Sequence, residues 1–253
     1  HKTESIPITT YHGGALLATS NTDKAFSIPE MQWRTAMAGM LGILSTSLQV
    51  PTSCPYCQTS DEDPAWMRDH ITMCPRGSAG HNVLHERIVM QLRKILLKEM
   101  KIPKRRIPDG EQRCLCADGS QRRPSDLTVE DWDYEGHHLY IEDVTGIEAI
   151  TTDTGAQHAS RPGEAAKFAE DKKFRNFPEL AASISAYRFV PMAFETYGRI
   201  GQHADALLRE WACTLNKPHY RSRWKRQISE EIHFTSAELL LKAMGVAQDQ
   251  TVA

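Results

Sequence analysis

The spacing of apolar residues along the chain predicts two helices and four strands between residues 81 and 195. Residues 81–100 form an amphipathic pattern, with apolar side chains at helical spacing: Val83, Leu84, Ile88, Leu92, Ile95 and Leu96. Three β-rich runs follow, at 111–119, 125–132 and 137–146. A helical stretch begins at Pro162, and a buried strand spans 187–195. This order of elements predicts an α/β fold with a small mixed sheet flanked by helices.

The same patterns place further elements on either side of this core. Pro191 interrupts the last strand, which favours an edge or bulge position, because proline cannot donate a ladder hydrogen bond. Residues 201–215 form an amphipathic helix, and one or two more follow in 221–244. We divide the chain into four parts: a helical lead-in (1–50), a cysteine-containing segment (51–80), an α/β domain (81–215) and a basic helical extension (216–253).

Residues 122–145 read as a β-hairpin that carries acidic residues on both strands. If Tyr134 and Glu135 are the two turn residues, Asp126 lies directly opposite Asp143, with Cβ atoms about 4.5–5.5 Å apart. Two carboxylates this close repel each other unless a cation lies between them, and Mg²⁺ is the hard ion that suits them. The alternative is a hairpin whose acids face water. A one-residue slip of the turn would put the two acids on opposite faces.

The cysteines predict a second metal site upstream. Cys54, Cys57, His70 and Cys74 follow the pattern C-x2-C-x12-H-x3-C, which brings two ligands from a tight turn toward two from one helical turn. Four such ligands fill a tetrahedral Zn²⁺ shell, so the zinc is expected to be structural. The alternative is a set of scattered buried cysteines. The pattern does not decide whether such a knuckle touches nucleic acid or only pins two segments together.

Composition limits the partners. The net charge of −2 across 253 residues gives no global basic field, so nucleic acid would have to bind local patches. No signal-peptide pattern opens the chain, and the longest apolar run, around 37–44, is too short to cross a bilayer. We expect a soluble intracellular protein without membrane contact. The chain begins with His rather than Met, so we read it as a fragment or a processed piece.

Three clusters of cations are the candidate phosphate contacts, although such clusters also occur only for solubility. They are Lys104, Arg105 and Arg106; Arg122 and Arg123; and Arg221, Arg223, Lys225 and Arg226. Trp224 lies within the last cluster, where it either stacks on a base or anchors a helix; the anchor is the favoured interpretation.

The order of these motifs resembles the PD-(D/E)xK restriction-endonuclease-like domain that ends site-specific non-LTR retrotransposon proteins. The similarity rests on five stretches in sequence order: CPYC…H…C, GHNVLHERI, RRPSDLTVEDW, LYIEDVTG and EAAKFAEDKKF. FVPMAFETYG is similar to a further family stretch, and the resemblance covers most of the chain. It implies a CCHC zinc knuckle at 51–80 and a metal-dependent DNA endonuclease at 81–215. It also implies nuclear action beside the reverse transcriptase portion of the same polyprotein and its RNA.

The resemblance also implies site residues. Asp126 and Asp143 would hold Mg²⁺ or Mn²⁺, with the main-chain carbonyl of Val144 as a further ligand and Glu142 excluded by strand alternation. Thr145 stands where the family's motif usually has lysine, so the catalytic cation would come from the next helix. Its candidates, with Lys173 preferred, are Lys167, Lys172 and Lys173. Glu86 falls where the family's helix carries an acid and is a further candidate.

Two other functions remain open. A catalytically inactive protein with the same fold could bind nucleic acid or protein. Thr145, at the position where the family usually has lysine, supports this possibility. A zinc-knuckle interaction module joined to an unrelated α/β domain is the second, and it requires Asp126 and Asp143 to lie far apart.

Overall fold

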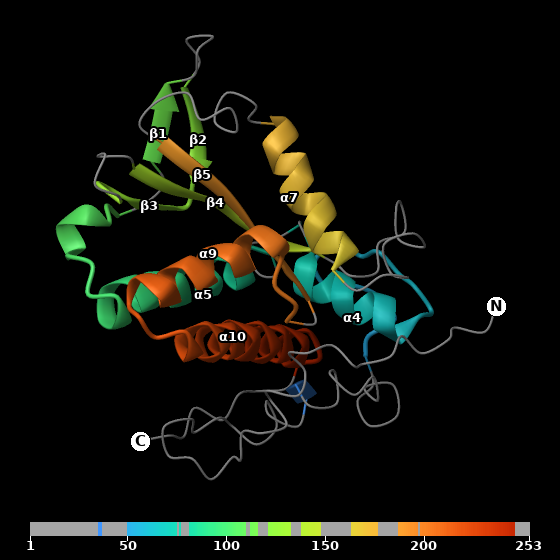
Figure 1. Ribbon diagram of the computed structural model, residues 1–253. Coiled ribbons are helices and arrows are strands. Elements are labelled where there is room, and N and C mark those ends of the chain that lie inside the picture. Colours follow the sequence, from blue (N-terminus) through green and yellow to red (C-terminus); the bar gives the residue numbers. More distant parts are fainter. Residues whose placement is uncertain are drawn as a thin grey trace.

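A computed structural model describes residues 35–36, 50–74, 76, 81–109, 112–115, 121–132, 138–147, 163–176, 187–196 and 198–245. These ranges hold a helix-rich mixed α/β structure (Figure 1). Its helices are α4 (Pro64–Met73), α5 (His81–Lys94), η2 (Ile95–Glu99), η3 (Lys104–Arg106), α7 (Glu164–Asn176), α9 (Gln202–Thr214) and α10 (His219–Ala243). Its strands are β1 (Gln112–Leu115), β2 (Gln121–Ser125), β3 (Leu127–Val129), β4 (His138–Ile147) and β5 (Tyr187–Glu195). The predicted helical lead-in (1–50) lies outside these ranges apart from residues 35–36, which are helical, and residue 50.

The main sheet has the strand order β3-β4-β5, with β3 antiparallel and β5 parallel to β4. β1 and β2 pair separately as an antiparallel ribbon. The crossover from β4 to β5 contains α7, as the parallel pairing of the two strands requires. The predicted strand at 187–195 matches β5, and Pro191 lies opposite a bulge, since its neighbour Met192 pairs with Val144 rather than Asp143. Proline at such a site removes no regular ladder bond.

The predicted hairpin exists between β3 and β4, but its predicted register is wrong by one residue. Leu127 pairs with Ile141 and Val129 with Leu139, so Asp126 is not paired directly with Asp143. The physical reason is that β3 ends early. Glu130 N–H donates to the Arg106 carbonyl at 2.8 Å, and Asp131 turns the chain with φ of +48°.

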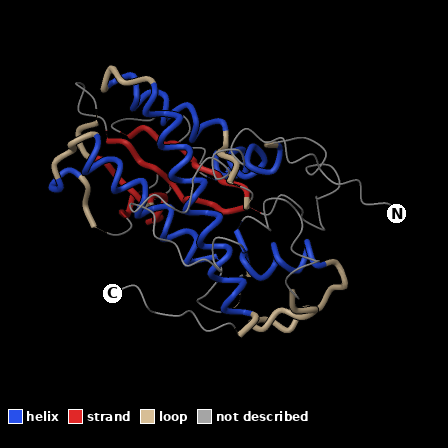
Figure 2. Tube along the Cα trace, turned by 90° about the horizontal axis from the view of Figure 1, so that it is seen from below, coloured by secondary structure: helices blue, strands red, loops and turns tan. Residues whose placement is uncertain are grey.

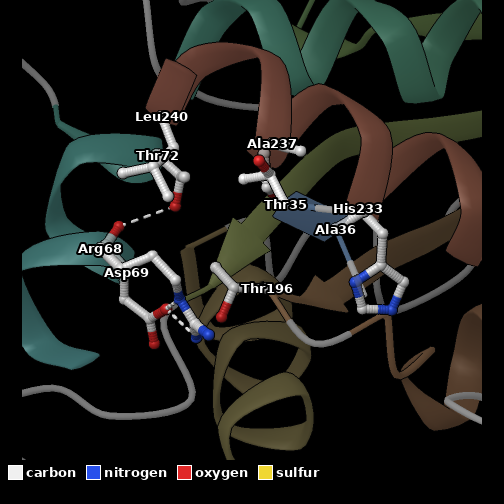
Figure 3. A pocket seen from close by; sticks show the side chains of 10 residues that line it. Thr35, Ala36, Arg68, Asp69, Thr72, Thr196, His233, Ala237 and Leu240 are labelled. Atoms are coloured by element: carbon white, nitrogen blue, oxygen red, sulfur yellow. Dashed lines mark hydrogen bonds and ion pairs between the residues drawn. The ribbon is translucent and has the colours of Figure 1, made fainter. Parts of the chain in front are cut away.

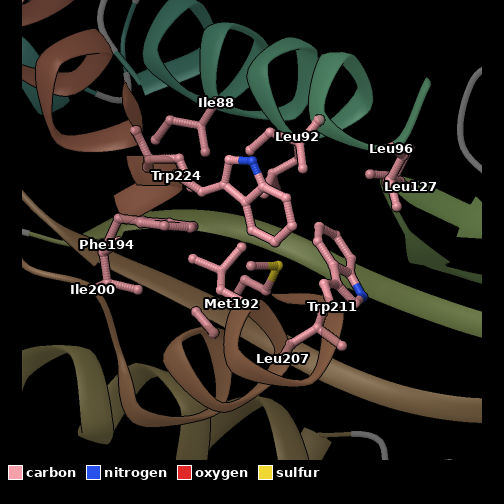
Figure 4. Close-up of a cluster of buried hydrophobic side chains, with 14 of the residues drawn as sticks. Ile88, Leu92, Leu96, Leu127, Met192, Phe194, Ile200, Leu207, Trp211 and Trp224 are labelled. Carbon is pink, nitrogen blue, oxygen red and sulfur yellow. The ribbon is translucent and has the colours of Figure 1, made fainter. Parts of the chain in front are cut away.

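The main sheet lies between helices on both faces (Figures 1 and 2). Alternate residues of β5 separate the two sides: Val190, Met192 and Phe194 face α5, α9 and α10, whereas Ala193 packs against α7. We call the first side the main core (Figure 4). Its largest fully buried side chains from the three helices include Trp211 and Trp224. Both faces of β5 are therefore buried, which explains its nearly continuous apolar sequence.

The C-terminal part of the described chain supports this core. The helix predicted at 201–215 corresponds to α9, and the extension forms one long helix, α10. Trp224 is fully buried and donates from Nε1 to Glu99 Oε2 at 2.7 Å, so it anchors α10 and is not available to stack on a base. Among the described helices, none has both the length and the hydrophobicity to cross a membrane.

Candidate functional site

The four predicted zinc ligands converge. The ligand atoms of Cys54, Cys57, His70 and Cys74 all lie within 4.8 Å of one another. Cys54 and Cys57 belong to a tight turn closed by a 2.9 Å hydrogen bond from Gln58 N–H to the Cys54 carbonyl. His70 lies in the last turn of α4, and Cys74 follows the end of that helix. The arrangement therefore fits the convergence that the spacing predicts.

The chemistry of this donor set suits zinc. Three sulfur atoms and one imidazole nitrogen are typical of closed structural Zn²⁺ sites. Hydrogen bonding with Thr59, supported by His70, lowers the pKa of the Cys57 thiol to about 6, whereas burial raises the pKa of Cys74 to about 12. Cys57 is thus ready as a thiolate near neutral pH, whereas Cys74 must lose its proton when metal binds.

The knuckle packs against the C-terminal end of α10. Cys54, Cys74, Met67 and Ile71 form a buried apolar cluster with Leu240 of α10. The Trp66 ring stacks on the imidazole ring of His70, with 4.9 Å between the ring centroids, and so covers this predicted zinc ligand. The loop between the two ligand pairs is acidic, with Glu62 and Asp63 exposed, so it would repel a phosphate backbone. These contacts favour the pinning role over nucleic-acid contact.

A pocket continues the boundary between the knuckle and α10 (Figure 3). Arg68, Asp69 and Thr72 of α4 line it together with His233 and Leu240 of α10. Arg68 forms an ion pair with Asp69, and Thr72 Oγ1 donates to the Asp69 carbonyl at 2.9 Å. Both interactions lie within α4, and the knuckle meets α10 through the Leu240 cluster and the shared lining of this pocket.

Asp126 lies at the bend between β2 and β3 and is contacted from α5. His85 Nε2 lies 2.9 Å from Asp126 Oδ2. His85 borders the buried stripe of α5, because Leu84 and Ile88 are fully buried, whereas Glu86 is exposed. The structure thus brings His85, rather than the predicted Glu86, to the carboxylate. In the sequence, the only signal for this contact is the place of His85 beside the apolar stripe of the helix predicted at 81–100.

Asp143 is the extra residue at the β4 bulge. Glu142 pairs with Pro191 and Val144 with Met192, which leaves Asp143 between them. Two residues oppose one across a bulge, so strict alternation no longer excludes Glu142 from the face of Asp143. Extending the β3–β4 register by one residue places the Asp126 backbone beside that of Glu142, next to the bulge. The side chains of β4 lie outside the described part of the structure.

The candidate lysines lie on α7, which covers the face of the sheet opposite to α5. Lys167 and Lys172 are exposed, and Lys173 is half-buried. The next residue, Phe174, packs edge-on against Phe189 of β5 at 5.7 Å. His85 thus contacts Asp126 from the α5 side of the sheet, whereas the predicted lysines lie on the α7 side.

Two buried carboxylates outside the set of predicted site residues are helix caps. Glu170 of α7 accepts hydrogen bonds from the N–H groups of His203 and Ala204, and Glu195 accepts one from Ala166. Burial raises the pKa of both, to about 7 for Glu170. Each acid closes the first turn of a neighbouring helix, α9 or α7, where the helix dipole favours a negative charge. Their role is structural.

The predicted basic patches differ in how their cations are engaged. Every cation of the α10 patch has a carboxylate partner: Arg221 and Lys225 with Asp205, Arg223 with Glu99, and Arg226 with Glu230. In η3, Lys104 and Arg105 are exposed, whereas Arg106 donates to the Glu130 carbonyl at 2.9 Å. Arg122 and Arg123 lie in β2, where only the backbone is described. The η3 cations are the more accessible to a phosphate.

Comparisons with known proteins identify no relative, since no family model, curated protein or solved structure matches the chain.

Proposed function

We propose that the protein is a metal-dependent DNA endonuclease that hydrolyses phosphodiester bonds. The observation that carries the proposal is the position of Asp126 at the β2–β3 bend, one residue beyond the Leu127–Ile141 pair and beside the β4 bulge at Asp143. The element order from α5 to β5 and the resemblance of the motifs to the PD-(D/E)xK domain of retrotransposon proteins also support it. Bulges recur next to active sites because they redirect side chains.

In this proposal Asp126 and Asp143 hold a Mg²⁺ or Mn²⁺ ion, and the Val144 carbonyl is a further ligand. When bound, the metal polarises the phosphate and lowers the pKa of a coordinated water. Lys173, or Lys172 beside it, would balance the negative charge that develops on the phosphoryl oxygens. Glu86 would act from the solvent side of α5, through water rather than by direct contact with Asp126.

DNA would follow the exposed η3 cations, Lys104 and Arg105, and the β2 pair, Arg122 and Arg123. We do not assign a phosphate to the α10 patch, because its four cations are already paired with three carboxylates, Asp205 being shared by Arg221 and Lys225. The proposed cellular setting, also from the resemblance, is the nucleus, beside a reverse transcriptase portion of the same polyprotein and its RNA.

A nucleic-acid-binding or protein-binding module without catalysis is the second candidate. Two observations favour it: Thr145 occupies the usual lysine position, and α7 lies on the face of the sheet opposite to the Asp126–His85 contact. Both candidates predict DNA affinity, and only the first predicts cleavage.

Paired measurements of DNA affinity and DNA cleavage separate the two candidates. For the nuclease, Asp126→Asn should retain DNA affinity within a few-fold and lose cleavage by at least about 100-fold, because a ligand of the ion is lost. Asp131→Asn is the matched control, since Asp131 is an exposed acid in the next turn and asparagine also tolerates its positive φ. DNA binding without cleavage by the wild type in Mg²⁺ or Mn²⁺ would favour the inactive module.

A further inference from the structure

The contact between α5 and Asp126 adds an imidazole to the proposed acidic site. His85 Nε2 lies 2.9 Å from Asp126 Oδ2, and the side chains are 22% and 12% exposed. The pair is therefore mostly shielded from water but still partly accessible. A substrate phosphate needs such access to reach an ion at this position.

The spacing of the two donor atoms is the spacing of neighbouring metal ligands. Nitrogen and oxygen donors bind transition metals about 2.0–2.2 Å from the ion, so two donors at right angles are about 3 Å apart. A plain hydrogen bond has the same length, so distance alone does not separate the two roles. The position of the pair favours the metal-ligand role, because the Asp126 backbone is next to the β4 bulge that carries Asp143.

We infer that His85 is a direct ligand of the catalytic metal, together with Asp126. The inference rests on the proposed function for its third ligand, Asp143. It has a consequence for the choice of ion. Mg²⁺ prefers an all-oxygen shell, whereas imidazole suits transition metals. The site should therefore bind Mn²⁺ more tightly than Mg²⁺, and histidine nitrogen should be bonded to the bound Mn²⁺.

The direct test is pulsed electron paramagnetic resonance of Mn²⁺ added to the full chain with its Cys3His site already loaded with zinc. The expected signal is a nitrogen coupling to Mn²⁺ that changes when the protein is labelled with ¹⁵N-histidine. This measurement needs no mutation. Mn²⁺ bound without nitrogen coupling, or no Mn²⁺ binding at all, would overturn the inference.

Variants assign the nitrogen to one residue. His85→Ala should remove the coupling and weaken Mn²⁺ binding at least about tenfold in calorimetry, with a smaller effect on Mg²⁺. His219→Ala, which removes an exposed histidine of α10, should change neither quantity. A coupling that persists unchanged in folded His85→Ala would contradict the assignment.

DNA cleavage by the same samples separates this inference from the proposed function. Nitrogen-coupled Mn²⁺ without any cleavage would leave His85 as a ligand and refute the nuclease. Cleavage that proceeds equally in the wild type and in His85→Ala, without nitrogen coupling, would refute the ligand and leave the nuclease standing.

Discussion

Replacing Cys54 with serine should detach the knuckle from α10 while the main core stays folded. Cys54 is fully buried, and its sulfur is one of the four convergent ligands. The substitution removes that sulfur and leaves three ligands. The main core contains no knuckle ligand, so its packing does not depend on this change.

The metal is expected to supply most of the free energy that holds the knuckle. Apart from the ligands, the buried cluster contains only Met67, Ile71 and Leu240 among the described residues. Burying three such side chains contributes about 4.5 to 9 kcal/mol. Structural zinc contributes about 10–16 kcal/mol in small zinc domains at neutral pH. The fully buried apolar contacts therefore contribute less than the metal, and the partly buried Val50, Tyr56, Trp66, Ala243 and Met244 add to them.

Metal analysis and amide hydrogen exchange measure this prediction. Wild-type protein should contain one zinc, and Cys54→Ser should contain much less. Exchange should accelerate in residues 50–74 and at the end of α10, but not in α5 or α9. Leu240→Ala is the matched control: it should keep its zinc and lose about 2–5 kcal/mol of knuckle docking. A wild type without zinc, or Cys54→Ser with full zinc and unchanged exchange, would refute the reasoning.

Three further predictions concern the core. Burial raises the pKa of Glu170 from 4.5 to about 7, so the folded state holds this proton more tightly and the free energy of unfolding should fall by about 3 kcal/mol as pH rises from 4.5 through 7. Urea denaturation at pH 5 and pH 8 should show a smaller fall in Glu170→Gln, and an equal fall would contradict the assignment. Trp224→Phe should cost about 1.5–3 kcal/mol through its lost bond to Glu99, with DNA affinity unchanged; weaker DNA binding by the folded variant would restore the stacking role. Gly198→Ala should lower the melting temperature, because its Cβ would lie 2.3 Å from Ser229 Oγ and φ is +77°; an unchanged temperature would refute this close contact.

The sequence predicted well the features that depend on local spacing. The ligands on a turn and on one helical turn converge as the C-x2-C and H-x3-C spacings require. The bounds of β5 followed from its nearly continuous apolar run, and those of α9, within one residue, from its amphipathic periodicity. Pro191 predicted an edge or bulge position, and β5 lies at the edge of the described main sheet, with Pro191 next to the β4 bulge.

The features that were missed depend on contacts between distant parts of the chain. The hairpin register depends on Glu130, which bonds to Arg106 instead of continuing β3. No periodic pattern of apolar residues in the sequence indicates that contact. His85 meets Asp126 across 41 positions of sequence, and the α10 cations find Glu99 and Asp205 in other helices. Charge clusters in a sequence show where cations lie but not which carboxylates neutralise them.

Nicking of a supercoiled plasmid by wild type and Asp143→Asn tests the proposed acidic metal site most directly. The wild type should nick in Mn²⁺ or Mg²⁺ and stop in EDTA. Asp143→Asn, with its zinc content and melting temperature preserved, should be at least about 100-fold slower. Equal nicking by wild type and Asp143→Asn, or no nicking by the wild type in either ion, would contradict the account.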